Sequence, residues 1–168
     1  MSESKNPSSF DMALTEAEAA CSAFLNDMLE LKAGVNSHVG VRRDRSAVDC
    51  MVFDIGSMLT GDVASFRARN YHWRATADFY DRKRENLQRT VMRLLERFPV
   101  APQFEAEHPL LADTNVVHFR IAPESNAVSA ISTVEMEVAK GSPKVAVYSC
   151  TVLFDVVFNA GPRAAICS

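Results

Sequence analysis

The densest group of metal-ligand side chains in this 168-residue chain is Glu105, Glu107 and His108. Carboxylates and imidazole bind hard or borderline divalent cations. The three residues share one proline-flanked acidic loop, and no second cluster supplies the remaining ligands of a closed site. The sequence therefore predicts no metal site, and the Glu105–His108 loop has no assigned role.

The sequence contains no signature of covalent catalysis or of phosphate binding. Nucleophilic catalysis needs a nucleophile, a base and an orienting group, and the chain lacks a Gly-x-Ser-x-Gly elbow. A phosphate cradle needs a glycine-rich turn that opens a helix, whereas the six glycines are dispersed. We therefore expect no catalytic residue, no cofactor and no enzyme, with a small enzyme or ligand-binding domain as the weakest alternative.

Arginines alternate with aromatic residues in one short segment, where Arg67, Arg69 and Arg74 stand beside Tyr71 and Trp73. Arginine contacts phosphates and aromatic rings stack on bases. The same residue types are enriched in protein interfaces. Three interpretations stay open from the residues alone: a protein interface, a nucleic-acid surface, or an ordinary solvated strand with a half-buried Trp.

The net charge of −3 hides an uneven distribution. Residues 1–40 carry −4, residues 41–97 carry +4 and residues 98–168 carry −3. A basic middle between acidic ends fits contact with nucleic acid, or contact between copies through opposite charges. The overall pI of about 5.8 is too low for a dedicated nucleic-acid binder.

Two segments have the periodicity of core-facing helices. The first is Thr15–Ala33, which begins with a capping box from Thr15 to Glu18 and ends before Gly34. The second is Asp81–Phe98, whose apolar stripe faces the core while most of its arginines lie elsewhere.

The ends of the second helix also have sequence signals. Asp78 or Asp81 can cap its first turn, and Pro99 stops it.

Alternating or apolar segments predict five strands, with Gly56–Gly61 as the turn between the first two. The predicted strands are Ala47–Ile55, Asp62–Ala75, Asn115–Ile121, Ile131–Lys140 and Lys144–Asn159. In Asn115–Ile121 the predicted apolar side is Val117, Phe119 and Ile121.

The last two predicted strands form a hairpin through Gly141, Ser142 and Pro143. Its second strand, Lys144–Asn159, is about twice the usual strand length of 5–6 residues. It is apolar on both sides, which predicts a central strand covered on both faces or a strand covered by another subunit.

These elements predict an α+β fold: a mixed or antiparallel sheet with two main helices packed on it and a long C-terminal hairpin. We expect residues 11–160 to form one domain, between a flexible N-terminal tail of residues 1–10 and a C-terminal tail of residues 161–168. Cys21, Cys50 and Cys150 are expected to be buried thiols and Cys167 an exposed one. No apolar run reaches the ~18–20 residues of a membrane span, and the polar N-terminus is no signal peptide.

The segment from Phe66 to Asn159 resembles the tail terminator (tail completion) proteins of long-tailed bacteriophages. The resemblance lies in the order of the elements and in the types of residue they contain. The elements are a strand with arginines, an amphipathic helix, a further strand and a long hairpin. The sequences that carry it are Phe66–Arg74, Phe79–Arg89, Leu94–Pro99, Val116–Ile121 and Val152–Asn159. A leading helix at Thr15–Ala33 also fits.

The resemblance implies a structural virion protein of the phage tail and neck, made in the host cytoplasm. Such a protein would form a ring of about six copies on the tail tube, which stops tube growth and joins the filled head. Its partners would be itself, the tail tube protein and a head–tail connector protein, with DNA only as cargo in the lumen and no membrane. Another neck or connector protein, or a nucleic-acid-binding α+β module, is the alternative.

Six charged residues are the predicted interface, because they stand on otherwise sheet-like segments. They are Arg67, Arg69, Arg74, Lys140, Lys144 and Asp155.

Overall fold

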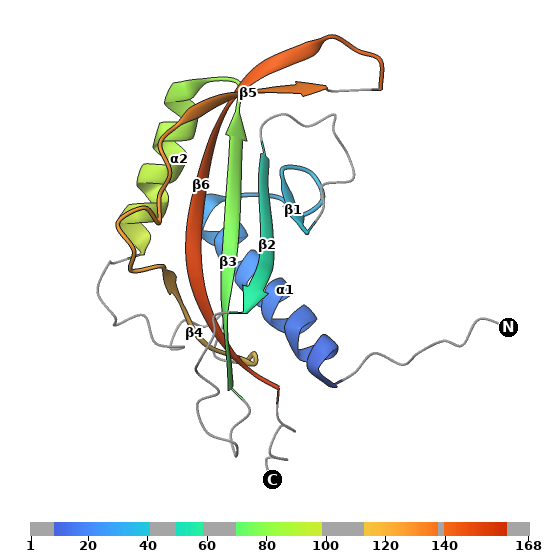
Figure 1. Cartoon of the computed structure of the whole chain (residues 1–168), viewed down its shortest axis with the longest axis vertical. Helices are drawn as coiled ribbons and strands as arrows, with labels where there is room; N and C mark the ends of the chain where they lie inside the picture. Colours follow the sequence, from blue (N-terminus) through green and yellow to red (C-terminus); the bar gives the residue numbers. More distant parts are fainter. Residues whose placement is uncertain (1–8, 41–49, 59–69, 99–112, 138–139, 161–168) are drawn as a thin grey trace, which may run out of the picture.

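Six strands form one mixed sheet, and both helices pack on the same face of it (Figure 1). The computed structural model describes residues 9–40, 50–58, 70–98, 113–137 and 140–160. The predicted α+β fold with two helices and a C-terminal hairpin is confirmed. The elements are α1 (Ser9–Leu29), β1 (Ser37–Val39), β2 (Cys50–Met58), β3 (Asn70–Asp81), α2 (Arg84–Arg97), β4 (Val116–Ile121), β5 (Ser132–Glu137) and β6 (Lys144–Asn159).

The long strand β6 is the centre of the sheet, whose order is β1-β2-β3-β6-β4. One edge of β6 pairs with β3 from Tyr148 to Asn159. The other edge is shared: β5 pairs with its first part, as far as Ser149, and β4 with its second, from Phe154 to Phe158. All pairs are antiparallel except β1 with β2. The length of β6 is therefore used to hold three other strands together.

The core lies between the helices and one side of the sheet. Every second residue of β6 from Cys150 to Phe158 is buried, as the alternation predicted. Phe154 meets Phe98, which follows α2, with ring centroids 5.4 Å apart, and Phe119 of β4 at 4.9 Å. Phe24 of α1 meets Phe98 edge-on at 5.5 Å. These contacts place both helices over the same face of β6 and β4.

Helix α1 begins earlier and ends earlier than the sequence predicted. Thr15 lies inside the helix, where its hydroxyl donates to the Asp11 carbonyl at 2.8 Å, so it is no N-cap. The helix stops at Leu29, and Glu30 takes the left-handed conformation with φ 57°. Gly34 adopts its own positive φ, 75°, in the following turn instead of ending the helix.

Helix α2 buries Leu87, Val91 and Leu94 as its periodicity predicted, but it starts three residues later. Asp81 is not its cap, because the N-cap residue is Lys83, whose side chain makes no capping hydrogen bond. The Asp81 carboxylate accepts the Lys83 N–H at 2.7 Å, just before the helix. Asp78 is not a cap. It belongs to β3 and accepts a hydrogen bond from the Thr151 hydroxyl of β6.

The strand boundaries differ from the prediction where polar residues lie inside strands. β2 continues through Gly56 to Met58, and β3 continues to Asp81 through residues predicted as a helix entry. The short strand β1 lies between the first predicted helix and the first predicted strand, where no strand was predicted. Cross-strand pairing overrides weak local propensity at these places.

The predicted apolar side of β4 is wrong at one residue. Val116 and Phe119 are buried, whereas Val117 is 44% exposed. The pairing with β6 shifts register between Val116 and His118, so Val117 is an extra residue that faces outward. A bulge of this kind depends on the partner strand, and strict alternation does not reveal it.

Candidate functional site

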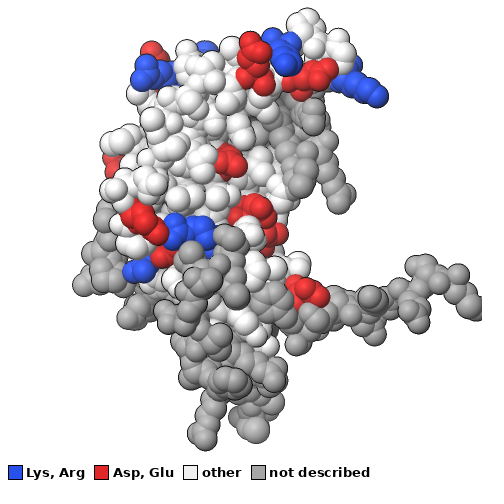
Figure 2. Space-filling model, in the orientation of Figure 1, with Lys and Arg blue, Asp and Glu red and all other residues white. Residues whose placement is uncertain are grey.

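The second face of the sheet is covered by neither helix and carries polar and charged side chains of β3, β4 and β6. Figure 2 shows this side of the molecule, with blue and red atoms gathered near the middle of the sheet. Most side chains of this face are partly exposed, but Asp155 is buried at its centre. We call this surface the open face.

Asp155 is held by two arginines from the strands on either side of it. The sheet register puts it opposite Arg74 of β3 and also opposite Arg120 of β4. Its carboxylate lies 3.3 Å from Arg74 Nη2 and 3.4 Å from Arg120 Nη2. His72 Nε2 lies 3.6 Å from the same carboxylate. An Arg–Asp–Arg row therefore crosses three strands.

Glu124, in the loop after β4, completes the charge balance. It is ion-paired with Nη2 of Arg74. This hydrogen bond holds the pKa of Glu124 below its usual range and raises the pKa of Arg74. The loop is tied to β6 because the Leu153 N–H donates to the Ala127 carbonyl at 2.7 Å. The two arginines and the two carboxylates of this cluster are equal in number and opposite in charge.

A neutral, internally paired cluster is better suited to holding strands than to chemistry. Each charge already has a partner of opposite sign in the same cluster. A general base or an anion-binding arginine would need a carboxylate or a guanidinium able to turn to a ligand. We therefore interpret the Arg74–Asp155–Arg120 row as a brace that links β3, β6 and β4 on the open face.

The β5–β6 hairpin extends the sheet beyond the end of β3. β3 stops at Asp81, opposite Tyr148, while β6 continues back to Lys144 paired only with β5. One side of this extension is apolar, with Val134 opposite Val147 and Met136 opposite Val145. The other side carries the two glutamates of β5 and Lys144.

The apolar side of the hairpin is only partly covered. Val147 is buried, Val134 and Met136 are half-buried, and Val145 is 37% exposed. Val145 and Val147 have the same parity along β6 as Asp155, so this apolar side belongs to the open face. Figure 1 shows the hairpin projecting at the end of the sheet opposite β4.

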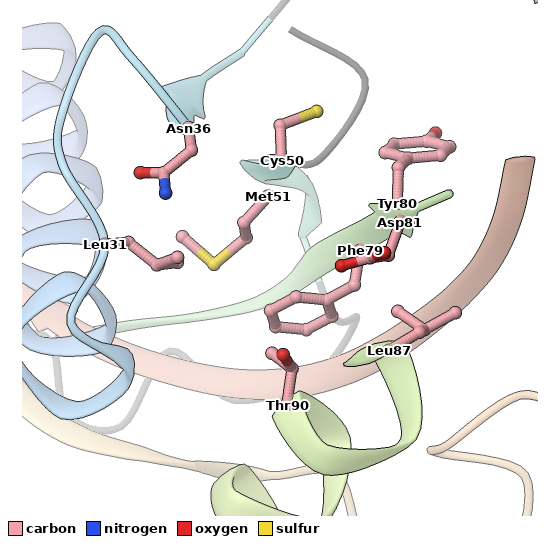
Figure 3. Close-up of a pocket in the computed structure, with 9 residues that line it drawn as sticks. All are labelled: Leu31, Asn36, Cys50, Met51, Phe79, Tyr80, Asp81, Leu87 and Thr90. Carbon is pink, nitrogen blue, oxygen red and sulfur yellow. The ribbon is translucent and has the colours of Figure 1, made fainter. Parts of the chain in front are cut away.

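A small pocket lies between the C-terminal end of α1, the start of β2 and the start of α2 (Figure 3). Leu31, Met51 and Phe79 gather at its centre, and its volume is about 100 Å³. Two polar groups on its wall already accept backbone hydrogen bonds: Asn36 from the Lys32 N–H and Asp81 from the Lys83 N–H. Ligand pockets usually measure about 300–1,000 Å³. This pocket is therefore smaller than a typical ligand site.

Among the described residues no group of three metal-ligating side chains is found. The Glu105–His108 loop lies outside those residues. Cys21, Cys50 and Cys150 are buried thiols, as predicted, and burial raises the pKa of Cys21 and Cys150. Cys167 falls outside the described part of the chain.

The structure brings two of the predicted interface residues together, Arg74 and Asp155, in the brace. Lys140 and Lys144 are exposed around the hairpin turn. Arg67 and Arg69 lie outside the described residues.

Arg120 and Glu124 were not among the predicted site residues. Arg120 was visible in sequence only as an arginine in an otherwise apolar strand. Its role depends on register, because only the pairing of β4 with β6 puts it opposite Asp155.

In the described part of the chain, neither helix is long and apolar enough to span a bilayer. Comparison with known proteins found no matching family model and no matching curated protein.

Proposed function

We propose that this chain is a structural protein of a bacteriophage virion, a tail terminator that caps the tail tube. It would act as a homo-oligomeric ring of about six subunits and provide the surface that joins the filled head. The order of elements in Phe66–Asn159, which resembles that family, is the starting point. The observation that carries the proposal is the amphipathic β5–β6 hairpin beyond the end of β3.

The hairpin supports capping because its apolar side reaches past the core that the helices cover. Val145 remains 37% exposed there, and Val134 and Met136 are half-buried. An exposed apolar strand pair with a polar reverse side suits a partner that covers one face of it. In our proposal the tail tube is that partner, and Lys140 and Lys144 lie at the rim of the contact.

The open face supports a structural role in a second way. Its charged residues are paired with one another across β3, β6 and β4, so the surface is held in one geometry. A rigid face is an advantage in assembly, because less conformational entropy is lost on docking.

Native mass spectrometry with negative-stain imaging tests the proposal, with and without magnesium. We expect closed rings of about six subunits with a central opening. Added to tail tubes from the phage that encodes the chain, these rings should bind tube ends and stop further growth. A strict monomer that leaves the tubes uncapped would contradict the proposal.

A further inference from the structure

The outward sides of the two helices carry opposite charge. From Ser9 to Glu30 the chain has five acidic residues and no basic one, and one of the five, Glu18, accepts the Ile55 N–H and so faces the sheet. From Arg82 to Arg97 it has six basic residues and two acidic ones. The charges of α2 stand on exposed positions around the buried stripe. Each subunit thus presents one acidic and one basic helix.

The outward side of α1 has the character of a packing surface. Small exposed residues, Ala19 and Ala23, stand between the acidic residues Glu16 and Asp27, and Met12 near the start of the helix is 56% exposed. Small side chains let a second helix approach closely. Helices that have apolar or small residues around most of their circumference are usually covered by other elements on more than one side. We call Met12, Glu16, Ala19, Ala23 and Asp27 the acidic face.

The outward side of α2 has matching chemistry. Arg89, Met92, Arg93, Glu96 and Arg97 are all exposed, and Met92 is 56% exposed. Methionine and arginine are enriched at protein interfaces. We call these residues the basic face.

The basic face has one ion pair near α1 of the same subunit. Arg93 lies 3.3 Å from Glu30, which follows α1, and both side chains are more than half exposed. Figure 1 shows α2 along one flank of the sheet, while the N-terminal half of α1 extends behind the sheet toward the other flank. Two different patches that point to different sides cannot satisfy each other within one subunit, but they can join neighbouring copies.

We infer that copies of this chain associate head to tail, with the basic face of α2 on one copy packed against the acidic face of α1 on the next. A contact between two different patches closes into a ring when the rotation per subunit permits it. The inference rests on the proposed ring and names the surfaces that form it. In this arrangement the β5–β6 hairpin takes no part in the contact between subunits and is available to bind the tail tube.

A second copy fits the basic face better than nucleic acid does. Two glutamates, Glu85 and Glu96, interrupt the positive charge of α2, and a methionine lies among its arginines. A surface that tracks phosphates gains from uninterrupted positive charge. The complementary acidic surface is present on the same chain, and the overall pI is about 5.8.

Charge reversal with complementation between variants tests the contact. Variant A carries Arg89→Glu and Arg97→Glu, and variant B carries Glu16→Lys and Asp27→Lys. Arg93 is kept because of its ion pair with Glu30. Alone, each variant sets like charges against each other at every contact, so we expect self-association about 100-fold weaker than wild type.

An equimolar mixture of A and B should recover the assembly. The α2 of variant A, now acidic, then packs against the α1 of variant B, now basic. The unchanged basic α2 of variant B packs against the unchanged acidic α1 of variant A. Native mass spectrometry should show even-numbered rings that contain equal numbers of A and B. A conservative control, Arg89→Lys with Arg97→Lys, should assemble like wild type, and circular dichroism should show that every variant is folded.

Several outcomes would overturn the helix contact. They are a wild type that stays monomeric at its highest soluble concentration, wild-type assembly of A or B alone, and a mixture that does not recover. If variant A assembles normally but loses salt-sensitive DNA binding, the basic face is a nucleic-acid surface instead. A different outcome would overturn the proposed function and leave the helix contact intact. In that outcome the rings form, and recover in the mixture, but never cap tail tubes.

Discussion

Arg74 and Asp155 are direct cross-strand partners on β3 and β6, and their side chains meet at 3.3 Å on the open face. The Asp155 side chain is only 3% exposed, so its charge is compensated by neighbours and not by water. Because Arg120 stands opposite Asp155 from the other side, one carboxylate ties three strands. Asp155 is therefore the shared partner of the two arginines at the centre of the open face.

Asp155→Ala should lower the free energy of unfolding by about 1–3 kcal/mol, because Arg120 loses its ion pair while Arg74 keeps only Glu124. Urea denaturation monitored by circular dichroism measures the loss. The matched control is Glu135→Ala at an exposed position of β5, which should change stability by no more than about 0.5 kcal/mol. Equal effects of the two substitutions would mean that the brace does not hold the sheet.

The bulge in β4 predicts opposite results for two neighbouring apolar residues. Phe119 is fully buried against four aromatic rings, including Phe154, so Phe119→Ala should cost about 3–5 kcal/mol of stability. Val117→Ala should cost at most about 0.5 kcal/mol, because Val117 faces outward. Thermal unfolding of both variants decides the register. A large loss of stability in Val117→Ala would show that β4 has no bulge and that Val117 faces the core.

Glu18 should make stability depend on pH. Its carboxylate accepts the Ile55 N–H of β2 at 3.1 Å, and burial, with the charge of Asp54, raises its pKa. The folded state therefore holds this proton more tightly than the unfolded state. Stability is lost as the pH rises from the unfolded value of about 4.3 through the folded pKa.

Glu18→Gln removes the charge and keeps an acceptor for Ile55. We expect the variant to match or exceed wild type at pH 7, by up to about 1 kcal/mol after allowance for solvent screening. The advantage should vanish near pH 3, where wild-type Glu18 is protonated in both states. Urea midpoints at the two pH values measure this. A stabilisation that is the same at both pH values would assign the effect to something other than the charge.

Two adjacent hairpin residues separate assembly from folding. Val145→Asp puts a charge on the apolar side of the hairpin, whereas Ala146→Asp puts the same charge on the polar side. Both positions are exposed, so both variants should unfold within about 1 kcal/mol of wild type, with Ala146→Asp the less stable because it faces Glu135. We expect Val145→Asp to form rings that no longer cap tail tubes, and Ala146→Asp to cap normally. Negative-stain imaging measures the lengths of the tail tubes that form with each variant. If both variants cap the tubes, the hairpin does not contact the tail tube.

Local patterns determined much of this fold. The alternation along Lys144–Asn159 predicted the exact bounds of β6 and its buried side, because the side-chain period of a strand is two residues. The stripe of Leu87, Val91 and Leu94 predicted the buried face of α2. These features depend only on neighbours in sequence, so the sequence alone is sufficient to locate them.

Tertiary structure decided what depends on pairing. Thr15 looked like a helix cap, yet α1 begins six residues earlier, and Ala13, which also precedes Thr15, is buried in the core. Val117 points outward because β4 is one residue longer than the segment of β6 it pairs with. The Arg74–Asp155–Arg120 brace combines residues from three distant segments, and only the register of β3, β6 and β4 brings their charges within about 3.5 Å of each other. Periodicity records which side of a strand a residue occupies, whereas register, which decides its partner, is set by the packing of the whole sheet.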